Sequence, residues 1–218
     1  MSEIIHLLHS PEELIAASDF AHNIEGLIIL LITLIFLFSR KYSILNKFRP
    51  ILLSFTGAFL ILYIFLHHPP SEWPLVFKVL TEDRQQLQHF LIALTAIFAG
   101  VGDYYGQKKK NILTISFPLM LLLIGIIFLM HPQHGVEEAV IKAVQFHEFL
   151  GSLLVINGFL ILTNMKYKNK SLFYVIVAIL FLITIMLLTY QEPVGAYHTI
   201  NNTNNTLLIY INMKFRIW

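Results

Sequence analysis

HNIEGLIILLITLIFLF, the stretch from His22 to Phe38, decides the fold class of this chain. Glu25 is its only charged residue, and most of the other positions are aliphatic or aromatic. An α-helix rises about 1.5 Å per residue, so a run of this length nearly covers the roughly 30 Å hydrocarbon core of a bilayer. The stretch therefore predicts a transmembrane helix.

Further runs of the same kind follow along the chain. They are Pro50–His67, Leu87–Val101, Ile112–His131, His147–Thr163 and Leu172–Tyr190. The 218 residues are 56% hydrophobic and only 13% charged, whereas soluble domains carry about 25% charged residues. These features predict an all-α polytopic membrane bundle of six transmembrane helices in three hairpins. We expect residues 1–192 to form one membrane domain and residues 193–218 to form an atypical C-terminal tail.

Basic residues are concentrated in alternate connections, after the first, third and fifth predicted spans. They are Arg40, Lys41, Lys47, Arg49, Lys108, Lys109, Lys110, Lys166, Lys168 and Lys170. By the positive-inside rule these connections face the cytoplasm, which places both termini outside. The chain is thus predicted to be a multi-pass protein of the cytoplasmic (inner) membrane, in contact with the lipid bilayer. Its net charge of +2 gives no argument for a nucleic-acid partner, and it has no cysteine for disulfides or thiolate metal sites.

Histidines recur at the opposite, extracytoplasmic ends of the predicted spans. Some open odd-numbered spans and others close even-numbered ones, so the serpentine topology brings them to one face of the membrane. Imidazole is the commonest metal ligand in proteins, and a carboxylate lies one turn after the first of these histidines. The candidate metal ligands are His22, Glu25, His67, His68, His89, His131, His134 and His147.

Several kinds of site remain open at this point. Imidazole binds copper, zinc and iron, so the residue types alone do not name the metal. Two histidines from different helices could instead ligate haem b in an electron-transfer or haem-handling protein. Gly26 and Gly151, each four residues after a histidine, would either clear space for such a flat ring or serve helix packing. A metal-dependent membrane hydrolase with Glu25 or Glu192 as base is a third reading, and a structural membrane scaffold with interfacial histidines is a fourth. No hydrolase motif supports the third, so an enzyme is the less favoured class.

Residues 72–159 carry a series of short motifs: Glu72-Trp73-Pro74-Leu75, Leu87-Gln88-His89, Phe117-Pro118-Leu119, the pair His131 and His134, and His147 followed by Gly151. In the order and approximate spacing of these motifs, this part of the chain resembles the copper-resistance D family of bacterial inner-membrane proteins. The resemblance implies copper transport or resistance at the cytoplasmic membrane, with histidines as ligands. We also expect a periplasmic metal carrier as a partner. Relatives commonly carry His-x-His where this chain has His131-x-x-His134, so the ligand geometry departs from the family pattern.

Overall fold

The structure is a computed structural model that describes residues 10–66, 69–133 and 135–197. Within these ranges the protein is helical and forms no strand, as predicted. The helices are α1 (Pro11–Phe38), α2 (Phe48–Leu66), α3 (Trp73–Glu82), α4 (Arg84–Lys109), α5 (Ser116–Leu129), α6 (Glu137–Tyr167) and α7 (Lys170–Leu188), with short 3-10 turns η2 (Ser43–Lys47), η3 (Pro70–Glu72) and η4 (Ile112–Ile115). Among the described segments six are long and apolar enough to cross a membrane, which confirms a multi-pass membrane protein.

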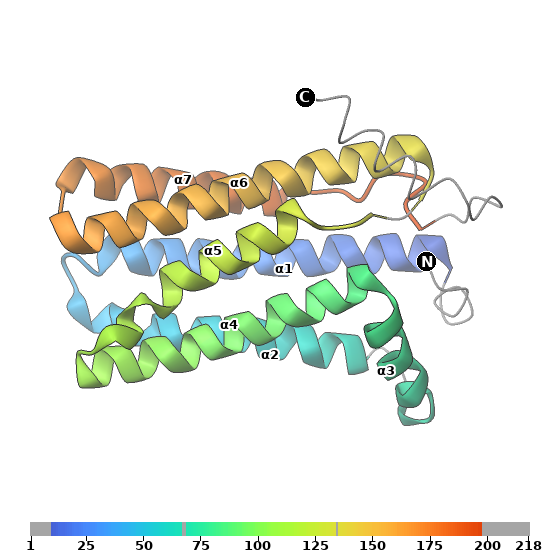
Figure 1. Ribbon diagram of the computed structural model, residues 1–218, viewed down its shortest axis with the longest axis horizontal. Coiled ribbons are helices and arrows are strands. Elements are labelled where there is room, and N and C mark those ends of the chain that lie inside the picture. The colour runs from blue at the N-terminus through green and yellow to red at the C-terminus, as the bar shows by residue number, and fades with distance from the viewer. Residues whose placement is uncertain (1–9, 67–68, 134, 198–218) are drawn as a thin grey trace.

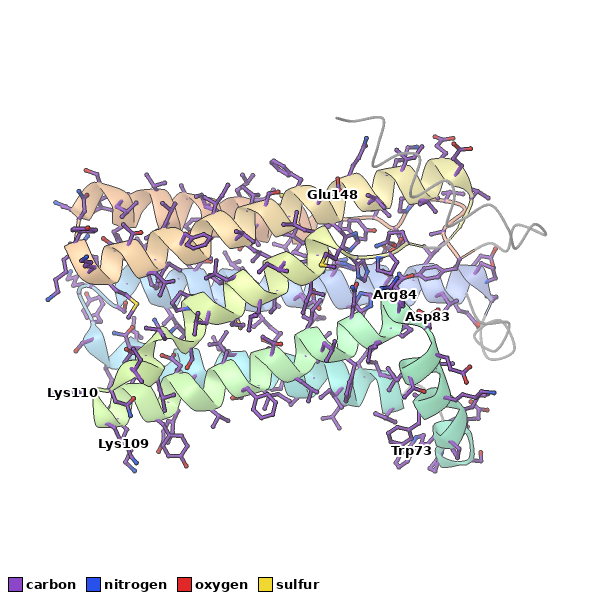
Figure 2. All side chains as sticks on the ribbon, viewed as in Figure 1. Trp73, Asp83, Arg84, Lys109, Lys110 and Glu148 are labelled. Atoms are coloured by element: carbon purple, nitrogen blue, oxygen red, sulfur yellow. The ribbon has the colours of Figure 1, made fainter. Side chains whose placement is uncertain are left out.

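Consecutive spans run in alternating directions, and α1 lies between the α6–α7 pair and the α2–α4 pair (Figure 1). The widest contacts join α5 to α6, α2 to α4 and α1 to α7. Each predicted hairpin partner therefore packs more extensively on a helix of another hairpin than on its own. The lysine-rich connections, with Lys109 and Lys110, lie at one end of the bundle, and Trp73, Asp83 and Arg84 lie toward the other (Figure 2). We call these the basic end and the histidine end.

Two helices begin well before the hydrophobic runs that predict them. α1 starts at Pro11 because Ser10 caps it: the Ser10 hydroxyl accepts from the Glu13 amide at 3.2 Å, and the Glu13 carboxylate accepts from the Ser10 amide at 2.9 Å. α6 likewise begins ten residues before His147. These first turns mix polar and apolar residues, so hydropathy alone does not mark them. His22 and His147 consequently lie about 15 Å inside their helices rather than at the ends.

The short helix α3 is an element that hydropathy does not predict. It buries Val76, Val79 and Leu80 along one face, at the histidine end beside α4. Trp73 begins it, and the indole N–H donates to the carbonyl of Phe65 at 3.2 Å. The amphipathic pattern is too short to span a bilayer, and its role is to cover the ends of α2 and α4.

Close backbone contact joins α2 and α4 from the middle of the bundle toward the basic end. A Cβ atom placed on Gly57 would overlap the carbonyl oxygen of Ala93, and one on Gly100 would lie 2.6 Å from the Pro50 carbonyl oxygen. Small residues at such a crossing allow two membrane helices to approach without intervening side chains. The contact leaves no space for a polar passage between these two helices at this depth.

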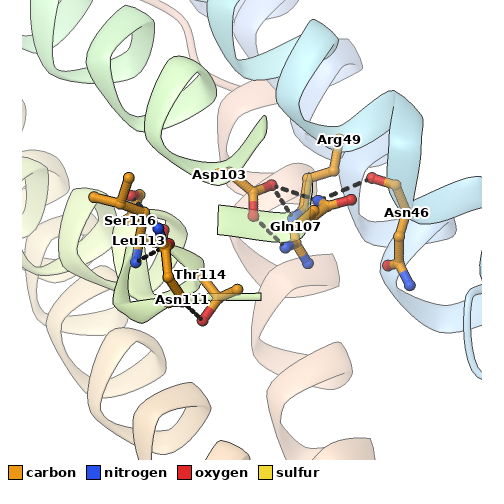
Figure 3. A network of polar contacts seen from close by, with 8 residues as sticks. All are labelled: Asn46, Arg49, Asp103, Gln107, Asn111, Leu113, Thr114 and Ser116. Atoms are coloured by element: carbon orange, nitrogen blue, oxygen red, sulfur yellow. Dashed lines mark hydrogen bonds and ion pairs between the residues drawn. The ribbon is translucent and has the colours of Figure 1, made fainter. Parts of the chain in front are cut away.

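A buried ion pair connects three helices at the basic end (Figure 3). The Arg49 guanidinium donates two hydrogen bonds to the two carboxylate oxygens of Asp103, at 2.8 and 2.7 Å, and it lies 5.1 Å above the Phe117 ring. The Gln107 amide donates to the same carboxylate at 3.0 Å and to the Asn46 carbonyl at 3.1 Å. Asp103 has no exposed surface. The pair thus joins the start of α2 to α4 and to α5, and it was not predicted from the sequence.

Candidate metal site at the histidine end

Four imidazoles from different elements meet at the histidine end. His22 comes from α1, His89 from α4, His131 from the turn after α5, and His147 from α6. The ring centroids lie 4.8 Å apart for His89 and His131, 4.8 Å for His131 and His147, and 5.9 Å for His22 and His147. All but His89 are buried. We call these four residues the histidine cluster.

Glu25 is the one other predicted ligand that the structure describes. His67, His68 and His134 lie outside the described residues. Glu25 lies one turn after His22 and lines a neighbouring cavity. The structure therefore brings together His22, His89, His131 and His147 and places Glu25 beside them.

Three of the cluster histidines are oriented by their own helices. In each case Nδ1 lies within hydrogen-bond distance of the carbonyl oxygen four residues earlier. The distances are 2.8 Å from His22 to Ser18, 2.9 Å from His89 to Gln85 and 2.7 Å from His147 to Ala143. Because a carbonyl oxygen can only accept, Nδ1 carries the proton and the Nε2 lone pair is left for another partner. At His147 the amide Nε2 of Gln133 also lies 3.1 Å from Nδ1, and we assign the proton to Nδ1 from the shorter contact with the Ala143 carbonyl.

The fourth ring, His131, is oriented by a glutamine instead. Its Nδ1 lies 2.6 Å from Oε1 of Gln88. The Gln88 amide is fixed in this orientation because its Nε2 donates to the carbonyl of Met130 at 3.3 Å. His131 therefore also carries its proton on Nδ1, and all four rings have the same tautomer.

With this shared tautomer each ring presents the lone pair of Nε2, and the N–H group on Nδ1 is already used in a hydrogen bond. Nε2 of His147 is buried and accepts no hydrogen bond from any described residue. A buried acceptor without a donor costs free energy, and a protonated Nε2 there would be a buried charge without a partner. A bound cation would relieve both problems. In the described part of the chain no three His, Asp or Glu side chains are already arranged around a common metal position, so the contacts are pairwise.

Aromatic rings shield the cluster from water. The Tyr190 ring lies 4.4 Å from His22 and 4.2 Å from Phe146, and Phe128 lies 5.4 Å from His147. A dry surrounding strengthens any interaction between the imidazoles and a positive charge.

The segment that follows α7, residues 190–197, closes the histidine end. The Ser18 hydroxyl donates to the Glu192 carboxylate at 2.6 Å, and the Glu192 amide donates to Asp19 at 2.6 Å. The Val136 amide donates to the Gly195 carbonyl at 3.0 Å. Burial raises the pKa of the Glu192 carboxyl above its ordinary value, although the hydrogen bond from Ser18 opposes this shift. Residues 193–197, predicted to begin an atypical tail, thus pack on the bundle, and residues 198–218 lie outside the described ranges.

A cavity of about 190 Å³ lies between α1, α2, α3 and α4, next to the cluster. His22, Glu25 and His89 lie on its wall, which is mostly apolar, and Tyr197 also lines it. No hydrogen bond or ion pair joins Glu25 to another described residue. An ionisable side chain inside a membrane span is costly, and its position beside two imidazoles marks this cavity as part of the candidate site.

The two glycines considered as space for a flat ring serve helix packing instead. A Cβ on Gly26 would lie 2.9 Å from the Leu188 amide of α7. A Cβ on Gly151 would lie 2.7 Å from the Gly125 carbonyl of α5. Both positions are therefore filled by neighbouring helices.

Comparisons with protein-family models, curated proteins and solved structures give no match to this chain. The resemblance to the copper-resistance D family therefore stays a prediction from the motifs quoted above.

The groups that orient and enclose the histidines were not predicted from the sequence. Gln88 directly precedes His89, and its polar position at the start of an apolar run was the one available signal. Tyr190 carries no such signal, because a tyrosine at the end of a span is ordinarily an interfacial residue. Its contact with His22 arises only when α7 packs on α1.

Proposed function

We propose that this integral membrane protein binds a copper ion through the histidine cluster and acts in copper transport or resistance. The observation that supports this most is the common tautomer of four clustered imidazoles. In metal sites a ligating histidine almost always donates its other ring N–H to a carbonyl, carboxylate or water, which fixes the ring and raises its basicity. Here His22, His89 and His147 donate to backbone carbonyls, and His131 donates to Gln88.

Copper is the first choice among the metals that imidazole accepts. For a given nitrogen site the affinity of divalent first-row metals peaks at Cu²⁺ and falls again at Zn²⁺. The chain offers no cysteine thiolate, so the cluster presents imidazole nitrogens, with the Glu25 carboxylate nearby. The ligands we propose are His22, His89, His131 and His147, and the motifs shared with the copper-resistance D family agree with this choice.

The site belongs to one side of the membrane. By the positive-inside rule the basic end faces the cytoplasm, so the histidine end faces outward, where a periplasmic metal carrier would deliver or collect the ion. The contact of Gly57 with α4 blocks a passage between α2 and α4 toward the basic end. In this conformation the protein therefore captures or holds copper on the outer side.

Haem b is the alternative ligand, and the space beside the cluster does not favour it. Pockets that hold drug-sized ligands occupy roughly 300–1,000 Å³, and haem is at least as large as such ligands. The cavity beside His22 and His89 measures about 190 Å³. The space beside Gly26 and Gly151, where a flat ring could otherwise lie, is occupied by the neighbouring helices α7 and α5.

The test is a measurement of copper content and visible spectrum on the full chain in mild detergent. Wild type is compared with His147→Ala and with Gln145→Ala, an exposed polar residue two positions earlier on α6. We expect wild type and Gln145→Ala to hold near-stoichiometric copper, and His147→Ala to bind it at least about 10-fold more weakly. A Soret band in the visible spectrum would show that the protein binds haem, and the copper proposal would be rejected in favour of the haem alternative. Folded, monodisperse wild type that binds neither would reject the proposal.

A further inference from the structure

A second concavity lies at the other end of the molecule, between α1 and α2. It has a volume of about 420 Å³ and its wall is almost entirely apolar. Leu31, Leu34 and Phe38 line it from α1, and Phe48 and Ile51 line it from the start of α2. α1 and α2 make few contacts with each other, which is why the groove stays open toward the surroundings of the bundle.

The groove lies within one leaflet of the bilayer. It extends along α1 from Leu31 to Phe38, which is about 10 Å of helix. One leaflet contributes about half of the roughly 30 Å hydrocarbon core. The groove therefore matches an acyl chain that enters from the basic end, whereas a helix of a second copy or of a partner would extend past it along the whole bundle.

Two lysines are close in the chain to residues that line this groove: Lys41 follows Phe38 by three positions, and Lys47 directly precedes Phe48. The connection from residue 39 to 49 contains no Asp or Glu, and Arg49 is already paired with Asp103 inside the bundle. Lys41 and Lys47 are exposed, and neither forms an ion pair with a described residue. Basic pockets between transmembrane helices bind the headgroups of anionic lipids.

We propose that this groove binds an anionic phospholipid, with one acyl chain between α1 and α2 and the headgroup at Lys41 and Lys47. The site lies at the basic end, opposite the histidine cluster, so it is independent of the proposed copper function. Bound lipid would fill the gap between two helices that have little direct contact, and so stabilise their arrangement.

The test is native mass spectrometry of the full chain in detergent, titrated with phosphatidylglycerol or with phosphatidylcholine. The Lys41→Ala/Lys47→Ala variant is compared with Lys108→Ala/Lys109→Ala, which removes the same charge from the end of α4. We expect wild type to prefer phosphatidylglycerol. We also expect the first variant to lose about 25-fold in affinity for it, at about five-fold per lysine, and the control to bind as wild type does.

A groove variant, Ile51→Trp, separates the acyl-chain contact from the charge. Ile51 is 60% exposed, so the larger side chain does not disturb the core. We expect it to weaken binding of both lipids. Equal losses in the two lysine variants would show diffuse electrostatic attraction and overturn the site. Unchanged lipid binding by Ile51→Trp, or a dimer whose interface protects the groove from lipid, would overturn it as well.

Discussion

Removal of Arg49 should destabilise the protein more than the loss of any exposed ion pair. In wild type the two oxygens of Asp103 accept bonds from the guanidinium at 2.8 and 2.7 Å, and Asp103 has no exposed surface. Arg49→Ala leaves this carboxylate buried without its cation. The loss of one partner of a buried pair costs about 3–5 kcal/mol. Because Gln107 still donates to Asp103 at 3.0 Å, we expect the lower end, about 3 kcal/mol.

The expected change is large enough to measure by thermal unfolding. For a chain of this size each kcal/mol shifts the melting temperature by about 2–4 °C, so Arg49→Ala should lower it by about 6–12 °C. The assay is loss of helical circular dichroism on heating in detergent. Lys142→Ala is the control, since it breaks the exposed Lys142–Glu138 pair and should not measurably shift the transition.

A second variant distinguishes a lost ion pair from a merely shortened side chain. Arg49→Met with Asp103→Leu replaces both charges by apolar groups, and such replacements of buried pairs are often neutral or stabilising. We expect it to recover most of the loss. If Arg49→Ala shifts the transition no more than Lys142→Ala does, Asp103 is not held as a buried charge and the reasoning is wrong.

Three further predictions follow from the same structure. Gly57→Ala should destabilise the protein by about 1–3 kcal/mol, because the added methyl group meets α4 backbone that cannot rotate away, and an unchanged melting temperature would contradict the α2–α4 contact. Because the pKa of Glu192 is raised in the folded state, stability should fall as pH rises from the ordinary glutamate pKa to the raised one and stay low above it. Glu192→Gln should remove this part of the pH dependence, and an identical slope in both proteins would exclude Glu192 as its source. Gln88→Leu should weaken copper binding about 10–100-fold by releasing His131, measured by competition with a chromophoric chelator, whereas unchanged affinity would remove its orienting role.

Much of the candidate site could be anticipated, but its internal geometry could not. His22, His89, His131 and His147 were predicted to share one face, and the structure places them in contact. Which rings are neighbours depends on the rotation of each helix about its axis, and helix packing sets that rotation. The hydrogen bond from His131 to Gln88 joins residues 43 positions apart, so no local sequence pattern predicts it.

The sequence by itself determined the class of the protein, the number of spans and the separation of a basic end from a histidine end. These are local properties, because a long apolar run has to lie in lipid as helix and charged connections have to stay in water. Only the tertiary structure decided that α1 packs on α7, that Arg49 meets Asp103, and that four imidazoles share one tautomer. Those features depend on contacts between helices far apart in the chain, and such contacts form only when side chains of complementary shape and polarity meet in the assembled bundle.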